Sequence, residues 1–231
     1  MKIGAIVLSR MGSSRLPGKA LKKIKKKSII DYVIERVLLI ENIDQVIIAT
    51  SYRKIDELLI KKFSSKKNIK TFRGSHNNVS LRFLKCMEKY NLDAAIRING
   101  DSPLHNYNLI NKLVKIYIKK KPDVLSNVFP RSYPVGMSIE IISYNALKIA
   151  LSKMSKKSDF EHVTKYFYEN NDQFNILNIS QLPTNHSIVH LAVDTEKDFD
   201  RFNWIINELG PDYLEAEYNK ILKIYNAYEK K

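Results

Sequence analysis

The chain alternates short apolar, β-branched runs with longer segments in which apolar residues recur about every 3.6 positions. The runs expected to be strands in the first half are Lys2–Leu8, Gln45–Thr50, Ile69–Phe72, Ala94–Ile98 and Val124–Asn127. The segments between them are expected to be helices: one begins after Ser28, a suitable N-cap, and the others cover Lys54–Phe63, Val79–Tyr90 and Leu109–Lys121. This alternation predicts a three-layer α/β fold with a mostly parallel central sheet.

The second half of the chain is less regular. Residues 129–137 contain two prolines and a glycine and are expected to form a loop. Further strands are expected at Ile139–Ser143, Asn175–Ile179 and Ile188–Val193, and further helices at Asn145–Ser152, Phe160–Asn170, Glu196–Leu209 and Leu214–Tyr228. No repeat or low-complexity linker divides the sequence, so residues 1–231 are predicted to form one domain with an inserted segment at about 129–190.

Composition excludes several classes of protein. Apolar residues make up 44% of the 231, enough for a sizeable core. The one cysteine, Cys86, lies on an apolar helix face; it rules out a disulfide scaffold and suits the reducing cytoplasm. We expect neither a targeting segment nor a transmembrane helix, because no apolar run approaches the ~20 residues that cross a bilayer.

The net charge of +15 admits a nucleic acid, a membrane surface or a small polyanion as partner. Thirty of the 39 cationic residues are lysines, spread along the chain. They are interpreted as a solvated background, and neither nucleic acid nor membrane is predicted as a partner. The arginines are more informative, because a guanidinium matches phosphate and carboxylate geometry. Those in or beside predicted strand ends and loops are Arg10, Arg15, Arg73, Arg82, Arg97 and Arg131.

The first predicted strand ends in the loop "SRMGSSRLPGKA", which concentrates small residues and cations. It is not a P-loop, because Gly12 and Gly18 enclose five residues and Ala20 follows Lys19 where a hydroxyl is required. We interpret it as a phosphate cradle of another design. Gly12, Ser13 and Ser14 let backbone N–H groups approach an anion, while Arg15 and Lys19 neutralise charge. An ordinary loop with solvent-facing cations is the alternative.

The stretch "SRMGSSRLPGKAL" resembles the N-terminal signature of the CMP-sugar-acid synthetases, most closely the SpsF-type cytidylyltransferases of spore-coat polysaccharide synthesis. Five further blocks agree in order: "TFRGS", "IRINGDSPL", "SNVFPRSYPVGMSIEI", "FEHVTKYFY" and "HLAVDTEKDF". The similarity covers about residues 1–205. It implies a Rossmann-like (GT-A-like) nucleotidyltransferase fold, CTP as donor with release of pyrophosphate, surface-glycan synthesis, and a homodimer formed through 129–190.

The resemblance also implies roles for individual residues. Those matching nucleotide-binding positions are Arg10, Gly12, Ser13, Ser14, Arg15, Lys19, Arg73, Gly74, Arg82 and Asn99. Asp101 and Asp194 match the pair that binds the metal, expected to be Mg²⁺, and together with Arg15 and Lys19 they are the candidate catalytic residues. A turn residue at Asp101, a helix cap at Asp194 and a surface cation at Arg82 remain open alternatives.

The acceptor side is less well defined. The matching blocks indicate Arg131, Tyr133, Glu140, Glu161 and His162, with Arg131 clamping an anionic group; a purely structural His162 is the alternative. Two aspartates of the family pattern "YPDGLDVE" are absent here, as are acidic residues expected around 76–81. We infer a more anionic acceptor or a changed substrate. Two competing functions are the transfer of another nucleotide to a sugar phosphate and the binding of nucleic acid by a basic module.

Overall fold

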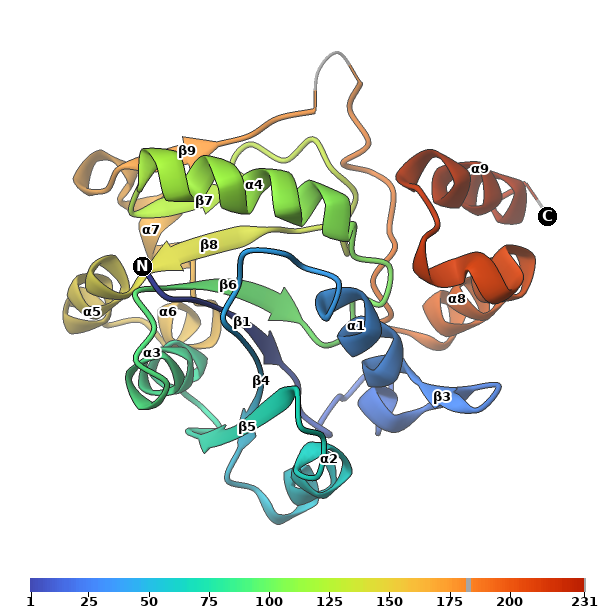
Figure 1. Ribbon diagram of the computed structural model, residues 1–231, viewed down its shortest axis with the longest axis horizontal. Coiled ribbons are helices and arrows are strands. Elements are labelled where there is room, and N and C mark those ends of the chain that lie inside the picture. Colours follow the sequence, from blue (N-terminus) through green and yellow to red (C-terminus); the bar gives the residue numbers. More distant parts are fainter. Residues whose placement is uncertain (182–183, 231) are drawn as a thin grey trace.

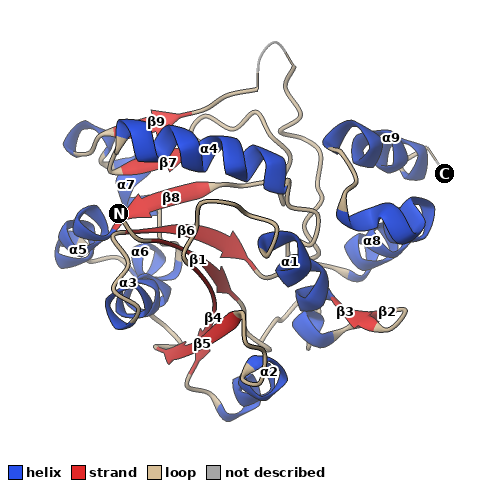
Figure 2. Ribbon diagram, in the orientation of Figure 1, coloured by secondary structure: helices blue, strands red, loops and turns tan. Residues whose placement is uncertain are grey.

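A computed structural model describes residues 1–181 and 184–230. Its centre is a seven-stranded sheet in the order β5–β4–β1–β6–β8–β7–β9 (Figure 1, Figure 2). In that order the strands are Ile69–Gly74, Gln45–Ser51, Ile3–Leu8, Ala94–Asn99, Glu140–Ser143, Val124–Ser126 and Ile176–Asn178. Within the described ranges, β8 alone runs antiparallel to its neighbours in this sheet. The other pairings are parallel, which confirms the predicted mostly parallel sheet.

Helices cover both faces of the sheet (Figure 1). One face carries α1 (Ile29–Val37), α2 (Glu57–Phe63) and α4 (Tyr107–Lys120); the other carries α3 (Val79–Lys89), α5 (Tyr144–Lys153), α6 (Lys157–Glu161) and α7 (Lys165–Glu169). Successive side chains of a strand point to opposite faces, so β1 contributes to both cores. Ala5 and Val7 pack with α1, whereas Ile6 packs with α3. The three-layer α/β fold is therefore confirmed.

Local signals place the helix starts where the sequence predicts them. The backbone N–H of Ser28 donates to Asp31 Oδ2 at 2.8 Å, the return bond of a capping box that begins α1. Asn78 begins α3 in a similar way, because its side-chain oxygen accepts from Leu81 N at 2.7 Å. Cys86 lies fully buried within α3, as predicted.

The C-terminal helices α8 (Glu196–Leu209) and α9 (Tyr218–Tyr228) form a separate packing group beside α1. Figure 1 shows them at the edge of the molecule, beyond the three layers. Tyr32 of α1 contacts Phe202 of α8 edge to face, with ring centroids 5.2 Å apart. This group places the start of α8 next to the carboxyl ends of the central strands. Among the described residues, no helix combines the length and apolar character needed to cross a membrane.

Three sequence predictions need correction. Residues 188–193 are not a strand of the sheet: the segment makes one isolated bridge, between His190 and Val135, because its backbone pairs with loops instead. The predicted helix Phe160–Asn170 is two helices, interrupted where the β-branched pair Val163 and Thr164 disfavours helix. The lysine tract after Leu21 contains an unpredicted hairpin of β2 (Lys23–Ile24) and β3 (Lys27–Ser28).

Candidate active site

Two cavities open at the carboxyl edge of the central parallel strands, the edge at which open α/β sheets bind ligands. The first, about 360 Å³, lies between the loop after β1, the start of α3 and the end of β6. The second, about 550 Å³, lies between the end of β6, the start of β8, the loop at 128–138 and the start of α7. Both are lined by Arg15, Arg97, Asn99, Asp101, His162 and Asp194. These six residues form the junction of the two cavities.

A buried carboxylate holds the first loop in place. Asp56, fully buried at the start of α2, accepts a hydrogen bond from Met11 N at 2.6 Å and another from the Ser51 hydroxyl. The carbonyl of Met11 in turn accepts from Ser13 N at 3.1 Å and from Gly18 N at 3.3 Å. Gly18 has φ 69°, a backbone conformation that favours glycine. The loop therefore folds back on itself before Lys19 enters the site.

Asp56→Ala is expected to destabilise the fold by about 1–3 kcal/mol, because it leaves the Met11 N–H buried without an acceptor. The loosened loop is also expected to raise the KM of a substrate that binds in the first cavity, which this loop lines. Asp56→Asn keeps an acceptor at the same place and is the matched control. Chemical denaturation and steady-state kinetics measure the two effects. Wild-type stability in the alanine variant would show that Asp56 does not hold the loop.

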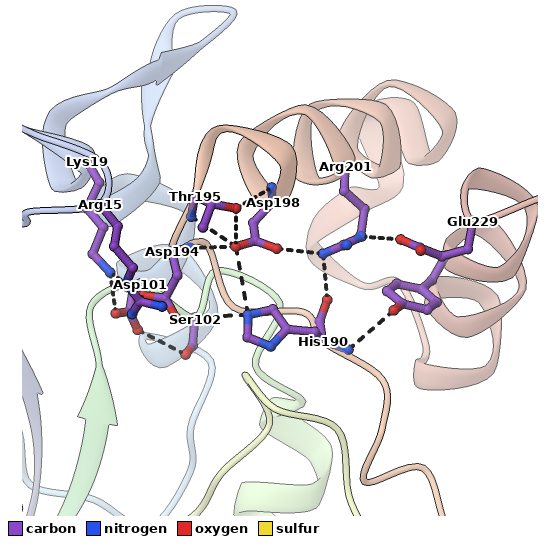
Figure 3. Close-up of polar contacts among 11 residues, drawn as sticks. Arg15, Lys19, Asp101, Ser102, His190, Asp194, Thr195, Asp198, Arg201 and Glu229 are labelled. Carbon is purple, nitrogen blue, oxygen red and sulfur yellow. Dashed lines mark hydrogen bonds and ion pairs between the residues drawn. The ribbon is translucent and has the colours of Figure 1, made fainter. Parts of the chain in front are cut away.

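Asp101 and Asp194 face each other at the junction, with Lys19 between them (Figure 3). Lys19 Nζ lies 2.6 Å from Asp101 Oδ2 and 2.9 Å from Asp194 Oδ1. Arg15 reaches the same oxygen of Asp194, also at 2.9 Å. Burial lowers the pKa of Lys19, but its contacts with Asp101 and Asp194 outweigh this and raise it above the ordinary value, so Lys19 is charged.

The backbone brings the two aspartates together although they are 93 positions apart (194 minus 101). Asp101 follows β6 through Gly100, whose missing side chain matters because a Cβ there would lie 2.7 Å from Ser9 Cβ. Val193 N donates to the carbonyl of Asp101 at 2.8 Å. One hydrogen bond therefore joins the chain before Asp194 directly to Asp101, without a strand at 188–193.

A network behind Asp194 fixes its orientation (Figure 3). Asp198 Oδ2 accepts from Asp194 N at 3.2 Å and from Thr195 N at 2.9 Å. Its other oxygen accepts from Arg201 at 2.8 Å, and Arg201 also contacts Glu229 at the end of α9. Thr195 is the residue that caps α8, accepting from Asp198 N. The alternative of Asp194 as the helix cap is therefore wrong, and its carboxylate is free to face the junction.

The first cavity is rich in cations. Among its described lining residues, five are cationic (Arg10, Arg15, Lys19, Arg82 and Arg97) and three are anionic (Asp101, Glu161 and Asp194). Arg10 contacts Glu161 at 2.7 Å, and Glu161 lines this cavity and not the second. Its role in binding the acceptor stays a prediction. The excess of positive charge suits a polyanion such as a triphosphate.

Arg82 lies almost completely buried in the wall of the first cavity and is not a surface cation. Burial, with a smaller contribution from the nearby charge of Arg10, lowers its pKa to about 10. Gly74 makes room for it, since a Cβ there would lie 2.7 Å from Arg82 Cγ. Neither Gly74 nor Arg73 lines either cavity; Arg73 donates to backbone carbonyls at 51 and 52. Asn99, by contrast, lies at the junction.

In the second cavity the partly buried side chains of Arg97 and Tyr168 contact the buried Glu140. Glu140 is 2% exposed; one of its oxygens accepts from Arg97 and the other from Tyr168, at 2.6 Å. Burial raises the pKa of Glu140, but the Arg97 charge and these hydrogen bonds outweigh it, and the net pKa is lowered. With both oxygens engaged, Glu140 orients Arg97 toward the junction. Tyr133 is half-buried and lines neither cavity.

Arg131 has a different environment in the same cavity. Its guanidinium donates to Pro134 O at 3.3 Å and to Ser138 Oγ at 3.0 Å, both uncharged groups. Within the part of the chain that the structure describes, it makes no ion pair. His162 is exposed where α6 gives way to α7 and borders both cavities. The interruption of the predicted helix is what places this histidine at the junction.

Sequence reasoning did not assign roles to Arg97, Asp56 or Asp198. Arg97 carried a usable signal, because it is a cation in the strand "AAIRIN", which is otherwise apolar up to its last residue, Asn99. Asp56 and Asp198 carried a weaker one, because each lies near a helix start, where capping is the common role. Their contacts with the first loop and with Asp194 depend on tertiary structure.

The donor set of the junction fits a hard divalent cation. The described residues contain no group of three or more histidine, cysteine or acidic side chains able to hold a metal. Two carboxylates suffice for Mg²⁺ when phosphate oxygens and waters complete the coordination. Asp101 and Asp194 already have a cation, the Lys19 ammonium, in contact with both.

The chain is similar to several known proteins. The spore coat polysaccharide biosynthesis protein SpsF of Bacillus subtilis is 27% identical over 227 residues, 94% of this chain and 92% of that protein. A 3-deoxy-manno-octulosonate cytidylyltransferase of Fusobacterium nucleatum is 33% identical over 121 residues, 52% of this chain and 48% of that protein. A solved cytidylyltransferase from Leptospira borgpetersenii, 26% identical, has a TM-score of 0.92 and covers 100% of this chain and 96% of its own, which confirms the nucleotidyltransferase fold. The family model described as cytidylyltransferase matches residues 4–230, and the chain therefore belongs to the cytidylyltransferase family.

Proposed function

We propose that this protein transfers CMP from CTP to a sugar acid or a related anionic acceptor, with release of pyrophosphate, for surface-glycan synthesis. One observation carries the proposal: a cation-rich cavity and a second cavity meet at the Asp101–Asp194 pair. At such a junction a donor phosphate, a metal ion and an acceptor would lie next to one another. The similar proteins named for spore coat polysaccharide synthesis and for 3-deoxy-manno-octulosonate cytidylyl transfer support the acceptor class.

The triphosphate would lie in the first cavity against the loop after β1. Arg15 and Lys19 would contact the β- and γ-phosphates, the part that leaves, and Arg10 and Arg82 add positive charge to the same wall. Asp101 and Asp194 would hold Mg²⁺, which supplies stabilisation of the charge that develops on the phosphate oxygens. Asn99, with an amide donor and acceptor at the junction, would contact the nucleotide beside it.

The acceptor would occupy the second cavity with its hydroxyl toward the junction. Arg97 and Arg131 would orient its anionic group, and His162, which borders both cavities, would accept the proton that the hydroxyl loses on attacking the α-phosphorus. Positioning two substrates in line is the main contribution of the protein to a reaction of this kind.

Arg131→Met is expected to raise the KM of the acceptor roughly tenfold to a hundredfold, because a charge-assisted hydrogen bond to the acceptor is lost. The KM of CTP should remain near the wild-type value, since Arg131 does not line the first cavity. Steady-state kinetics with each substrate varied in turn measure both constants. Equal increases in the two KM values would remove Arg131 from the acceptor site.

The proposal also covers assembly and location. Residues 1–231 would act as one domain and pair as a homodimer through 129–190, as the resemblance implies; residues 182–183 of that segment lie outside the described ranges. The buried free thiol of Cys86 and the use of CTP suit the cytoplasm. Sedimentation analysis, with substitutions at exposed positions of 129–190, tests the dimer.

Product identification tests the proposed reaction. The purified protein is incubated with CTP, Mg²⁺ and a panel of sugar acids, neutral sugars and sugar phosphates, and products are identified by mass spectrometry. A CMP ester formed with a sugar acid is the expected result. A nucleoside-diphosphate sugar formed from a sugar phosphate would overturn the acceptor class and keep the nucleotidyl transfer.

A further inference from the structure

Lys19 occupies the space between the two aspartates of the junction (Figure 3). Its ammonium nitrogen lies within 3 Å of an oxygen on each, at 2.6 Å from Asp101 and 2.9 Å from Asp194. The Lys19 side chain is 14% exposed, and those of Asp101 and Asp194 are 28% and 19% exposed. One oxygen of each carboxylate is therefore already in contact with the protein's own lysine.

Arg15 adds a second cation to the same group, at 2.9 Å from the oxygen of Asp194 that Lys19 also contacts. Two carboxylates carry two negative charges, and the ammonium and guanidinium together carry two positive charges. One divalent cation has the same charge as Lys19 and Arg15 combined. Exchanging the pair for a divalent ion leaves the charge around Asp101 and Asp194 balanced.

We propose that Lys19 is a built-in counter-ion, which a divalent metal displaces from Asp101 and Asp194, and that this displacement releases its ammonium to the phosphates of the nucleotide. An ammonium and a metal ion on the same oxygens repel each other strongly in a partly buried site, so both cannot be held there at once. The exchange rests on the contacts described above; the release to a triphosphate rests on the proposed function.

The exchange makes metal and nucleotide binding cooperative. A metal arriving alone competes with Lys19 and leaves its ammonium without a partner. A metal arriving with a triphosphate releases Lys19 and Arg15 into the first cavity, which both line and where the phosphates provide new partners. Coupling of this kind is reciprocal, so the metal strengthens nucleotide binding by the same factor.

Mn²⁺ binding in the absence of nucleotide tests the exchange. Electron paramagnetic resonance titrations are compared for the wild type, Lys19→Met and Lys22→Met. Lys19→Met is expected to lower the Kd of Mn²⁺ about tenfold or more, because two charge-assisted hydrogen bonds no longer compete with the metal. Lys22→Met removes the same charge three positions away, where the lysine contacts Glu196 and Phe199, and should bind Mn²⁺ like the wild type.

Two results would overturn the proposal. One is a Kd in Lys19→Met equal to or above that of the wild type; the other is equal tightening in Lys22→Met, which would indicate a general effect of charge. The double variant Lys19→Met/Asp101→Asn should not show the tighter Mn²⁺ binding of Lys19→Met. That result would show that the metal binds at Asp101. Mn²⁺ binding that is as tight in the double variant as in Lys19→Met would contradict a metal site at Asp101.

A second measurement uses the wild-type protein and does not depend on the folding of a variant. Acetylation of lysines is followed by mass spectrometry, with and without Mn²⁺ and without nucleotide. Faster labelling of Lys19 on addition of Mn²⁺, with Lys22 as the internal reference, is the expected result, and unchanged labelling of Lys19 contradicts displacement. Neither measurement uses CTP, so a failure of the proposed reaction and a failure of the exchange give different results.

Discussion

Asp101→Asn is expected to lower CTP-dependent pyrophosphate release by about a hundredfold to a thousandfold. The substitution keeps the size of the side chain and removes one of the two carboxylates that would hold the metal. Lys19 keeps its contact with Asp194, so the fold is expected to persist. Initial rates of pyrophosphate release at saturating Mg²⁺, together with a thermal melt of each protein, measure the two effects.

Asp172→Asn is the matched control for this prediction. Asp172 is exposed in the 3₁₀ turn Asn171–Gln173 and lines neither cavity, so the same change in charge should leave the rate unchanged. A rate in Asp101→Asn within about tenfold of the wild type would remove Asp101 from the metal site, since even the loss of a hydrogen-bond partner of a metal ligand typically costs about tenfold to a hundredfold.

Glu140→Ala is expected to reduce the free energy of unfolding by about 3–5 kcal/mol, because it leaves the Arg97 charge partly buried without its carboxylate. Arg97 is the first partner lost and Tyr168, which donates to the other oxygen, is the second. The double variant Arg97→Ala/Glu140→Ala should lose less than the sum of the two single variants, because it leaves no unpaired charge. Urea denaturation of the four proteins gives the coupling energy.

The same pair predicts a pH dependence. The folded-state pKa of Glu140 is below its ordinary value of 4.5, so its stabilising effect is present above that pH and is lost as pH falls through the folded value. The difference in stability between wild type and Glu140→Ala should therefore be constant from pH 7 to about 5 and shrink at lower pH. A difference that grows on acidification, or purely additive effects in the cycle, would contradict the buried ion pair.

The sequence predicted the central sheet because its signals are local. β-branched apolar runs and helical periodicity depend on neighbours in the chain, and β1, β4, β5 and β6 were found within one or two residues of their predicted ends. The segment 188–193 has the same composition as a strand, but its partners are the loops at Val135 and Asp101. Periodicity cannot show which partner an extended segment will find.

The site was predicted only in part, because local sequence signals identify candidate residues but not their partners in the fold. Asp101, Lys19 and Asp194 lie within ordered sequence blocks, and the structure brings them into contact although 175 positions separate the last two. The sequence did not show that Glu161 pairs with Arg10 and lines the first cavity. Nor did it show that Arg73, predicted to bind the nucleotide, donates to the carbonyls of Ser51 and Tyr52 at the end of the neighbouring strand β4. These outcomes depend on side-chain partners that no spacing in the sequence specifies.

The measurement that tests the account most directly is a thermal-shift scan with CTP, ATP, GTP and UTP, each with and without Mg²⁺, on the wild type and Asp101→Asn. The account predicts stabilisation by CTP in preference to the other three, dependent on Mg²⁺ and lost in the variant. Equal stabilisation by all four nucleotides, or by none, would contradict a CTP-binding cavity that meets its metal at Asp101 and Asp194.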